Sequence, residues 1–216
     1  MISKKILPAL LALSLSTTAF AQENTEKDKN EPGPRIGLKG GLSIATLVKT
    51  NDKSFTSTPL LGFNGGLVIL LPLGRVIALQ PEILYSQKGY KATGPGVLGD
   101  YDYHRYNNFL DIPLLLRINP SKDLGIVIGP QYSYLLTTHT KFNSGTTAYE
   151  QNVNNENNNI RKNIFGGVIG LDCNLSNNVY FYGRYTIDFK NNNGDGTSST
   201  PAYKNQVIQL GLGLLF

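Results

Sequence analysis

The chain has 216 residues, a formal net charge of +5, two histidines and a single cysteine. One cysteine cannot form an intramolecular disulfide, and the mild positive charge is scattered, which argues against nucleic-acid binding. Glycine and tyrosine are abundant, with 23 and 12 residues, and they occur among clustered asparagines. This composition favours an all-β chain with polar loops.

The first residues have the three regions of a secretory signal peptide. Lys4 and Lys5 precede an apolar stretch that ends in the tripeptide AFA at residues 19–21. That tripeptide is an A-x-A cleavage site, and the apolar stretch is too short to cross a bilayer. We therefore expect residues 1–21 to be removed on export. The mature chain then has a net charge of +3, because both lysines are lost.

Residues 22–34 are charged at first and then rich in proline and glycine. This segment is expected to form a flexible N-terminus, followed by a single domain over residues 35–216. No stretch of that domain approaches the roughly 18 consecutive apolar residues of a membrane-spanning helix. A helical membrane protein is therefore not expected.

From residue 35 onward, apolar residues alternate with small or polar ones, which predicts β-strands. Eight strands are predicted, at about residues 35–48, 60–71, 76–90, 103–118, 124–138, 160–173, 179–190 and 206–216. The short turns PLGR, NPSKD and NLSNN alternate with longer polar links. An even number of long strands with this alternation is typical of an antiparallel up-and-down transmembrane β-barrel.

The final strand shows how the faces differ. One face carries Ile208, Leu210, Leu212, Leu214 and Phe216, and the other is small or polar. In a soluble sandwich the apolar face would be inside, whereas in a membrane barrel it faces lipid. The strand lengths, the alternation of loops and the terminal phenylalanine favour the barrel.

The opposite faces of the strands carry charged residues, which a small barrel would enclose. A lone buried charge is costly, so these residues are expected to pair as a charge network in the lumen. The network is predicted to contain Lys39, Glu82, Lys88, Arg105, Asp111, Arg117, Asp172, Arg184 and Asp188. It would be either a structural plug or, if pairs exchange partners, a narrow gated ion path.

Aromatic residues lie near strand ends that lead to long loops. They are expected to form an aromatic belt at the outer membrane interface. The predicted belt comprises Tyr85, Tyr90, Tyr132, Tyr134, Tyr182, Tyr185 and Phe189. Phe216 is expected at the periplasmic rim. The Asn/Ser/Thr/Gly-rich loops are either solvated connectors or an adhesive surface.

Catalytic and cofactor motifs are weak in this chain. His104 follows Asp102 at the predicted outer rim, but no G-x-S-x-G motif accompanies it. Neither a phosphate loop nor a metal-ligand spacing is present, so no cofactor or metal and no enzymatic activity is expected.

Several segments resemble the PorT-like outer-membrane β-barrel family of Bacteroidota over essentially the whole mature chain. They are IGLKGGLSIATL, GFNGGLVILLPL, LQPEILYSQKGYK, NFLDIPLLLRI, GIVIGPQYSYLL and QLGLGLLF. The resemblance implies an eight-stranded barrel in the outer membrane of a Gram-negative bacterium. It also implies that Phe216 is an assembly signal, read by the barrel-assembly machinery after delivery by periplasmic chaperones.

These observations predict a monomeric outer-membrane protein surrounded by lipid, with both termini in the periplasm. Its predicted role is structural, or one of interaction with other envelope components. The alternatives are an accessory of protein secretion or transport, which would bind secretion or envelope proteins, and a narrow gated pore. A role cannot be assigned from the fold alone, because one fold serves many functions.

Overall fold

The computed structural model describes residues 33–49, 56–96, 99–144, 147–154, 160–194 and 202–216. The predicted signal peptide and residues 22–32 lie outside the described residues. Within the described part of the chain, no helix is long and apolar enough to cross a bilayer. The barrel occupies a unit that begins at Gly33.

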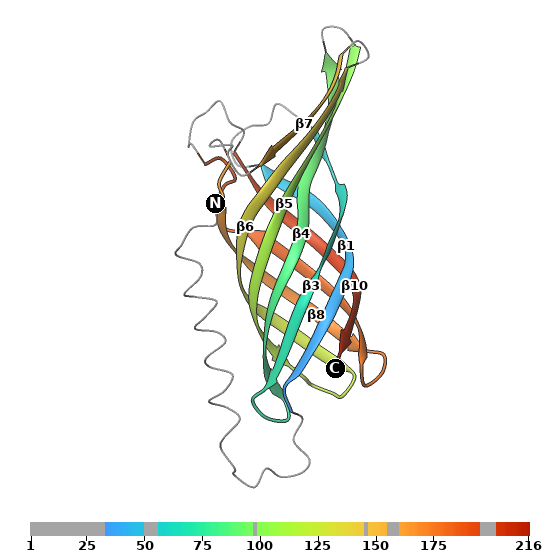
Figure 1. Ribbon diagram of the computed structural model, residues 1–216, viewed down its shortest axis with the longest axis vertical. Helices are drawn as coiled ribbons and strands as arrows, with labels where there is room; N and C mark the ends of the chain where they lie inside the picture. Colours follow the sequence, from blue (N-terminus) through green and yellow to red (C-terminus); the bar gives the residue numbers. More distant parts are fainter. Residues whose placement is uncertain (1–32, 50–55, 97–98, 145–146, 155–159, 195–201) are drawn as a thin grey trace. The chain divides into compact units, whose positions relative to one another are not determined.

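Eight long antiparallel strands close into a barrel (Figure 1). They are β1 (Arg35–Lys49), β3 (Leu60–Pro72), β4 (Ile77–Gly96), β5 (Gly99–Ile118), β6 (Leu124–Ser144), β8 (Asn163–Asn174), β9 (Val179–Asp188) and β10 (Tyr203–Leu215). Each strand pairs with its neighbours in this order. The ring closes where β1 pairs with β10, from Gly37 opposite Leu215 to Lys49 opposite Tyr203. The predicted fold is confirmed.

The two ends of the barrel differ. At one end, here called the turn end, short turns at residues 73–76, 119–123 and 175–178 join the strands. The C-terminus is held at this end, where Asn178 Nδ2 donates to the Leu215 carbonyl at 2.7 Å. The Phe216 N–H donates to the Ile36 carbonyl at 2.8 Å. The opposite end is called the loop end.

Two further strands lie in segments that were predicted to be loops. They are β2 (Thr56–Thr58), which pairs with β4, and β7 (Thr147–Asn154), which pairs with β6. In addition, β4 and β5 stay paired as far as Gly96 opposite Gly99. The loop prediction is wrong here, because polar Thr- and Tyr-rich segments also pair when a neighbouring strand continues beside them.

Large apolar side chains cover the outside of the barrel. Exposed examples occur on every long strand: Ile36, Leu38, Leu42, Phe63, Leu67, Ile83, Ile112, Leu114, Ile128, Ile169, Leu171, Phe181, Leu210, Leu212 and Leu214. On β5, Ile112 and Leu114 are 41% and 48% exposed, whereas Asp111, which precedes Ile112 and points to the other face, is 0% exposed. Such an outward apolar band is the surface that a transmembrane barrel presents to lipid. It excludes a sandwich with an apolar core.

Glycine makes room for the tyrosines inside the barrel. Gly213 on β10 lies directly opposite Tyr180 on β9. A Cβ atom at position 213 would overlap the Tyr180 ring. Tyr180 is only 1% exposed and packs against Val68 and Leu215, so it has little space into which to move.

We predict that Gly213→Ala destabilises the barrel by about 1–3 kcal/mol, because the added methyl group overpacks a tightly filled interior. Urea unfolding in phospholipid vesicles, followed by heat-modifiable gel mobility, measures this change. Gly40→Ala is the matched control on β1, since a Cβ there would meet only the Asn64 carbonyl at 3.8 Å. Equal stability of the two variants would contradict the proposed packing.

Candidate functional site

A cluster of five buried charges crosses the barrel interior near its turn end, and we call it the turn-end cluster. Lys39 Nζ lies 2.9 Å from Glu82 Oε2, and Arg117 Nη1 lies 3.0 Å from Asp172 Oδ2. Arg184 Nη2 contacts the other Asp172 oxygen at 2.5 Å and lies 3.9 Å from Glu82 Oε1. Because the five side chains come from β1, β4, β5, β8 and β9, the cluster links most of the barrel wall.

Neutral polar side chains complete the environment of this cluster. Arg117 donates from Nε to Asn119 Oδ1 at 2.8 Å and from Nη2 to Asn174 Oδ1 at 3.2 Å. Gln80 Nε2 donates to Glu82 Oε1 at 2.8 Å. These hydrogen bonds replace water around groups whose removal from water is costly.

A second cluster, called the loop-end cluster, contains Lys88, Asp111 and Asp188. Lys88 Nζ lies 3.0 Å from Asp111 Oδ1 and 4.0 Å from Asp188 Oδ1. Lys88 also donates to Ser133 Oγ at 3.0 Å, and Asn205 Nδ2 donates to Asp188 Oδ2 at 2.6 Å. The predicted lumen residues are thus divided between two levels of the barrel, although the sequence suggested a single network.

The two clusters carry opposite formal charges. The turn-end cluster has three cations and two carboxylates, which gives +1, and the loop-end cluster has one cation and two carboxylates, which gives −1. All eight side chains are at most 5% exposed. Close pairing offsets the cost of burying these charges, and at both levels side chains occupy the lumen.

Arg105, the ninth predicted member, lies elsewhere. None of the ion pairs among the described residues includes it. Arg105 pairs in register with Tyr90, and Tyr90 packs with Tyr103 and Tyr203 near the loop end. The residue is therefore too far along β5 to join the carboxylates, and an aromatic environment surrounds it instead.

The predicted aromatic belt is partly wrong. Tyr90 and Tyr182 point into the interior, where they are 5% and 0% exposed. Their position along the strand already indicated this, because Tyr90 has the same parity as Lys88, and Tyr182 the same parity as Arg184.

Other members of the predicted belt do lie on the outer face, and two phenylalanines join them. Tyr85 stacks on Phe63 with ring centroids 5.3 Å apart, and Tyr132 packs on Phe165 at 5.2 Å. Tyr134, Tyr185 and Phe189 also lie outside. Phe63 and Phe165 were not predicted to belong to this belt, although both lie on the apolar faces of their strands.

The remaining candidate residues lie on the outside. Phe216, the predicted assembly signal, is 70% exposed at the turn end, and Cys173 is exposed on β8. His104 Nε2 lies 3.1 Å from Asp102 Oδ1, and both side chains are partly exposed. Within the described residues, no group of three His, Cys, Asp or Glu side chains is placed to hold a metal ion.

We predict that Asp172→Asn is more damaging than Asp188→Asn. Neutralising Asp172 raises the formal charge of the turn-end cluster to +2 and leaves two buried arginines underpaired, a loss of about 3–5 kcal/mol. Neutralising Asp188 brings the loop-end cluster to zero, and the loss of its charged hydrogen bonds costs about 1.5–3 kcal/mol. Urea unfolding in vesicles measures both values. A larger loss of stability in Asp188→Asn than in Asp172→Asn would refute this charge assignment.

Comparisons with known proteins agree with this architecture. Ail of Yersinia pestis, solved with the heparin analogue sucrose octasulfate, is 13% identical with a TM-score of 0.50, and the alignment covers 86% of this chain and 100% of that one. Neisserial surface protein A is 12% identical with a TM-score of 0.50 and the same coverage of both chains. These likenesses concern the fold alone. None of the curated proteins compared with the chain matches it significantly.

A family model described as outer membrane protein beta-barrel domain matches residues 20–194, which is most of the chain. The match agrees with the closed antiparallel barrel, its outward apolar band and its charged interior. Membership implies a place in the outer membrane of a Gram-negative bacterium. The chain belongs to the outer membrane protein beta-barrel domain family.

Proposed function

We propose that this protein is an outer-membrane anchor that presents an interaction surface to the outside of the cell, and that it has no catalytic role. The observation that carries the proposal is the extension of β4, β5, β6 and β7 at the loop end (Figure 1). An anchor without an external task would not need strands of 20 and 21 residues, because about 9–11 residues cross a bilayer.

The chemistry of this extension suits contact with other macromolecules. Among the described strands, β7 pairs with β6 alone. The edge of β7 that faces away from β6 therefore offers backbone N–H and C=O groups. An exposed strand edge of this kind is a common docking site for an extended peptide. Charged side chains on the same sheet, such as Lys141 and Glu150, add polar contacts.

The orientation and partners follow from the same proposal. The turn end and the C-terminus face the periplasm, and Phe216 is read by the barrel-assembly machinery after passage with periplasmic chaperones. The folded barrel is a monomer in outer-membrane lipid. A PorT-like role as an accessory of secretion is the narrower form of this proposal, in which the partner at the loop end or turn end is a secretion component.

Site-specific photocross-linking in intact cells tests where partners bind. A photoreactive residue at Asn143 or Ala148, both exposed and paired in register on the extended sheet, is expected to give protein adducts. The same residue at Ser121, exposed in a turn at the opposite end, is the matched control. Adducts formed from Ser121 alone would place the interaction surface on the periplasmic side and contradict the proposal.

The filled lumen favours the role of a membrane anchor over that of a pore. We predict that the refolded barrel gives no single-channel steps in planar bilayers, since paired charges and tyrosines occupy its interior. The comparison variants are Glu82→Gln and Arg117→Gln, each of which breaks pairs in the turn-end cluster. Steps present in the wild-type protein and abolished by either variant would favour the gated pore instead.

A further inference from the structure

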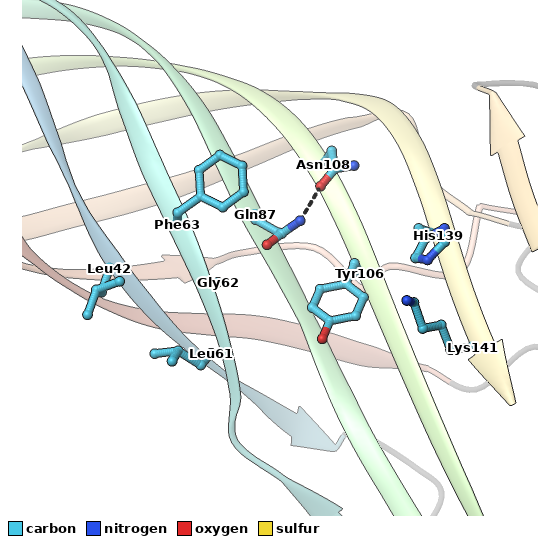
Figure 2. A pocket seen from close by; sticks show the side chains of 9 residues that line it. All are labelled: Leu42, Leu61, Gly62, Phe63, Gln87, Tyr106, Asn108, His139 and Lys141. Carbon is cyan, nitrogen blue, oxygen red and sulfur yellow. Dashed lines mark hydrogen bonds between the residues drawn. The ribbon is translucent and has the colours of Figure 1, made fainter. Parts of the chain in front are cut away.

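The barrel wall is irregular at the level of the loop-end cluster. Its outer side is hollowed into a groove of about 560 Å³, lined by Leu42, Leu61, Gly62, Phe63, Gln87, Tyr106, Asn108, His139 and Lys141 (Figure 2). Gln87 donates from Nε2 to Asn108 Oδ1 at 3.1 Å in this groove, and the next residue of β4 is the buried Lys88. Because successive side chains of a strand point to opposite faces, the groove and the loop-end cluster lie on the two sides of one stretch of wall.

Three backbone irregularities occur in this stretch. The ladder between β3 and β4 ends at the pair of Asn64 with Ser86. The ladder between β5 and β6 shifts register between Asn108 and Phe109. Gly89, directly after Lys88, has a φ of 143°, a conformation that favours glycine. Irregularities in strand pairing redirect nearby side chains and are frequent beside functional sites, so the side chains on the inner face were searched for a ligand site.

The loop-end cluster contains one more negative charge than positive charge. Lys88 Nζ lies 3.0 Å from Asp111 Oδ1 and 4.0 Å from Asp188 Oδ1, so two carboxylates converge on one ammonium group. All three side chains are at most 5% exposed, and bulk water therefore does not compensate the excess charge. No ion pair among the described residues joins either carboxylate to a second cation. An uncompensated charge in such a place is costly.

Two oxygen atoms at this level have no hydrogen-bond partner among the described residues. They are Asp111 Oδ2 and Asn205 Oδ1, on residues that are 0% and 1% exposed. The Asn205 amide is fixed beside Asp188, because its Nδ2 donates to Asp188 Oδ2 at 2.6 Å. Lys88 binds Asp111 through the other carboxylate oxygen and also donates to Ser133 Oγ at 3.0 Å. Both orphan oxygens are therefore left for a further partner, and an unsatisfied buried acceptor costs about 1–3 kcal/mol.

A monovalent metal cation meets both requirements. A water molecule could donate to the orphan oxygens, but it would leave the charge of the cluster at −1. A cation that binds the same oxygens brings the charge to zero. Carboxylate and amide oxygens are ligands for hard cations. A divalent ion would instead leave an excess of +1, and the described residues provide no third acidic, histidine or cysteine ligand to offset it.

We propose that the loop-end cluster binds a sodium ion through Asp111 Oδ2, the Asp188 carboxylate and Asn205 Oδ1. Sodium fits better than the larger potassium ion, because side chains fill an eight-stranded lumen. The ion connects β5 with β9 and β10, which are not neighbours of β5 in the barrel. It therefore links opposite walls just below the extended sheet. This site goes beyond the proposed interaction surface, and it does not depend on a protein partner.

Urea unfolding of the barrel in phospholipid vesicles tests the site at constant ionic strength. Sodium chloride is compared with potassium chloride and with the chloride of N-methylglucamine, a cation too large to enter the lumen. The urea midpoint of the wild type is expected to be about 1 M higher in sodium than in N-methylglucamine, the shift that nearly full occupancy of one site gives. Potassium should give a smaller shift.

Three variants assign the sodium effect to the loop-end cluster. Asp188→Asn balances the cluster without a metal ion and should abolish the sodium shift. Asn205→Leu keeps both carboxylates, removes the amide oxygen and should lose most of the shift. Glu150→Gln is the matched control, because it removes a carboxylate that is 58% exposed on the extended sheet, and it should keep the full shift. Heat-modifiable mobility verifies that each variant is folded before unfolding.

Two results would overturn the proposal. Equal midpoints of the wild type in sodium and N-methylglucamine would mean that a proton, and not a metal ion, compensates the excess charge. A sodium shift that Asp188→Asn and Asn205→Leu both retain in full would place the effect outside the cluster. Neither result changes the cross-linking expected from Asn143 and Ala148, so this proposal and the proposed function can fail separately.

Discussion

The structure depends on one constraint: its ionised side chains must pair with opposite charges inside the barrel, because the outside of the barrel faces hydrocarbon. Eight such groups lie in the interior, out of reach of bulk water. Because a buried unpaired charge costs several kcal/mol, each of these charged residues must lie at the level of an opposite charge on another strand. The register of the barrel and the pairing of the charges therefore stabilise one another.

The same constraint explains the small residues of the interior. Eight strands leave space only for side chains, so arginines and tyrosines fit where a neighbouring strand carries glycine. Gly125 lies against the Arg117 guanidinium, and Gly213 lies under the Tyr180 ring. A lumen filled in this way links strands that are far apart in the chain. It also leaves the outer surfaces as the place where the protein can meet other molecules.

Two outer surfaces differ from a plain lipid-facing wall. One is the sheet extended at the loop end by β4 to β7, where backbone pairing continues although the apolar alternation has ended. The other is the groove beside Phe63 and Asn108, where the wall pairing becomes irregular. The extended sheet arises because β4, β5 and β6 are longer than the strands on the other side of the barrel. A barrel with strands of unequal length thus has outer surfaces that a barrel with equal strands lacks.

The amino-acid sequence by itself determined the eight long strands and, for most of them, which side carries the large apolar residues and which side carries the charged ones. A period of two fixes which residues share a face, and it also places Tyr90 and Tyr182 inside. Only the tertiary structure decided how the charges are distributed between the turn-end and loop-end clusters. Lys88 and Glu82 share a face of β4, but they form ion pairs with residues of different strands. The position of Arg105 among tyrosines, the pairing of β7 and the groove likewise depend on register between strands, which alternation within one strand cannot specify.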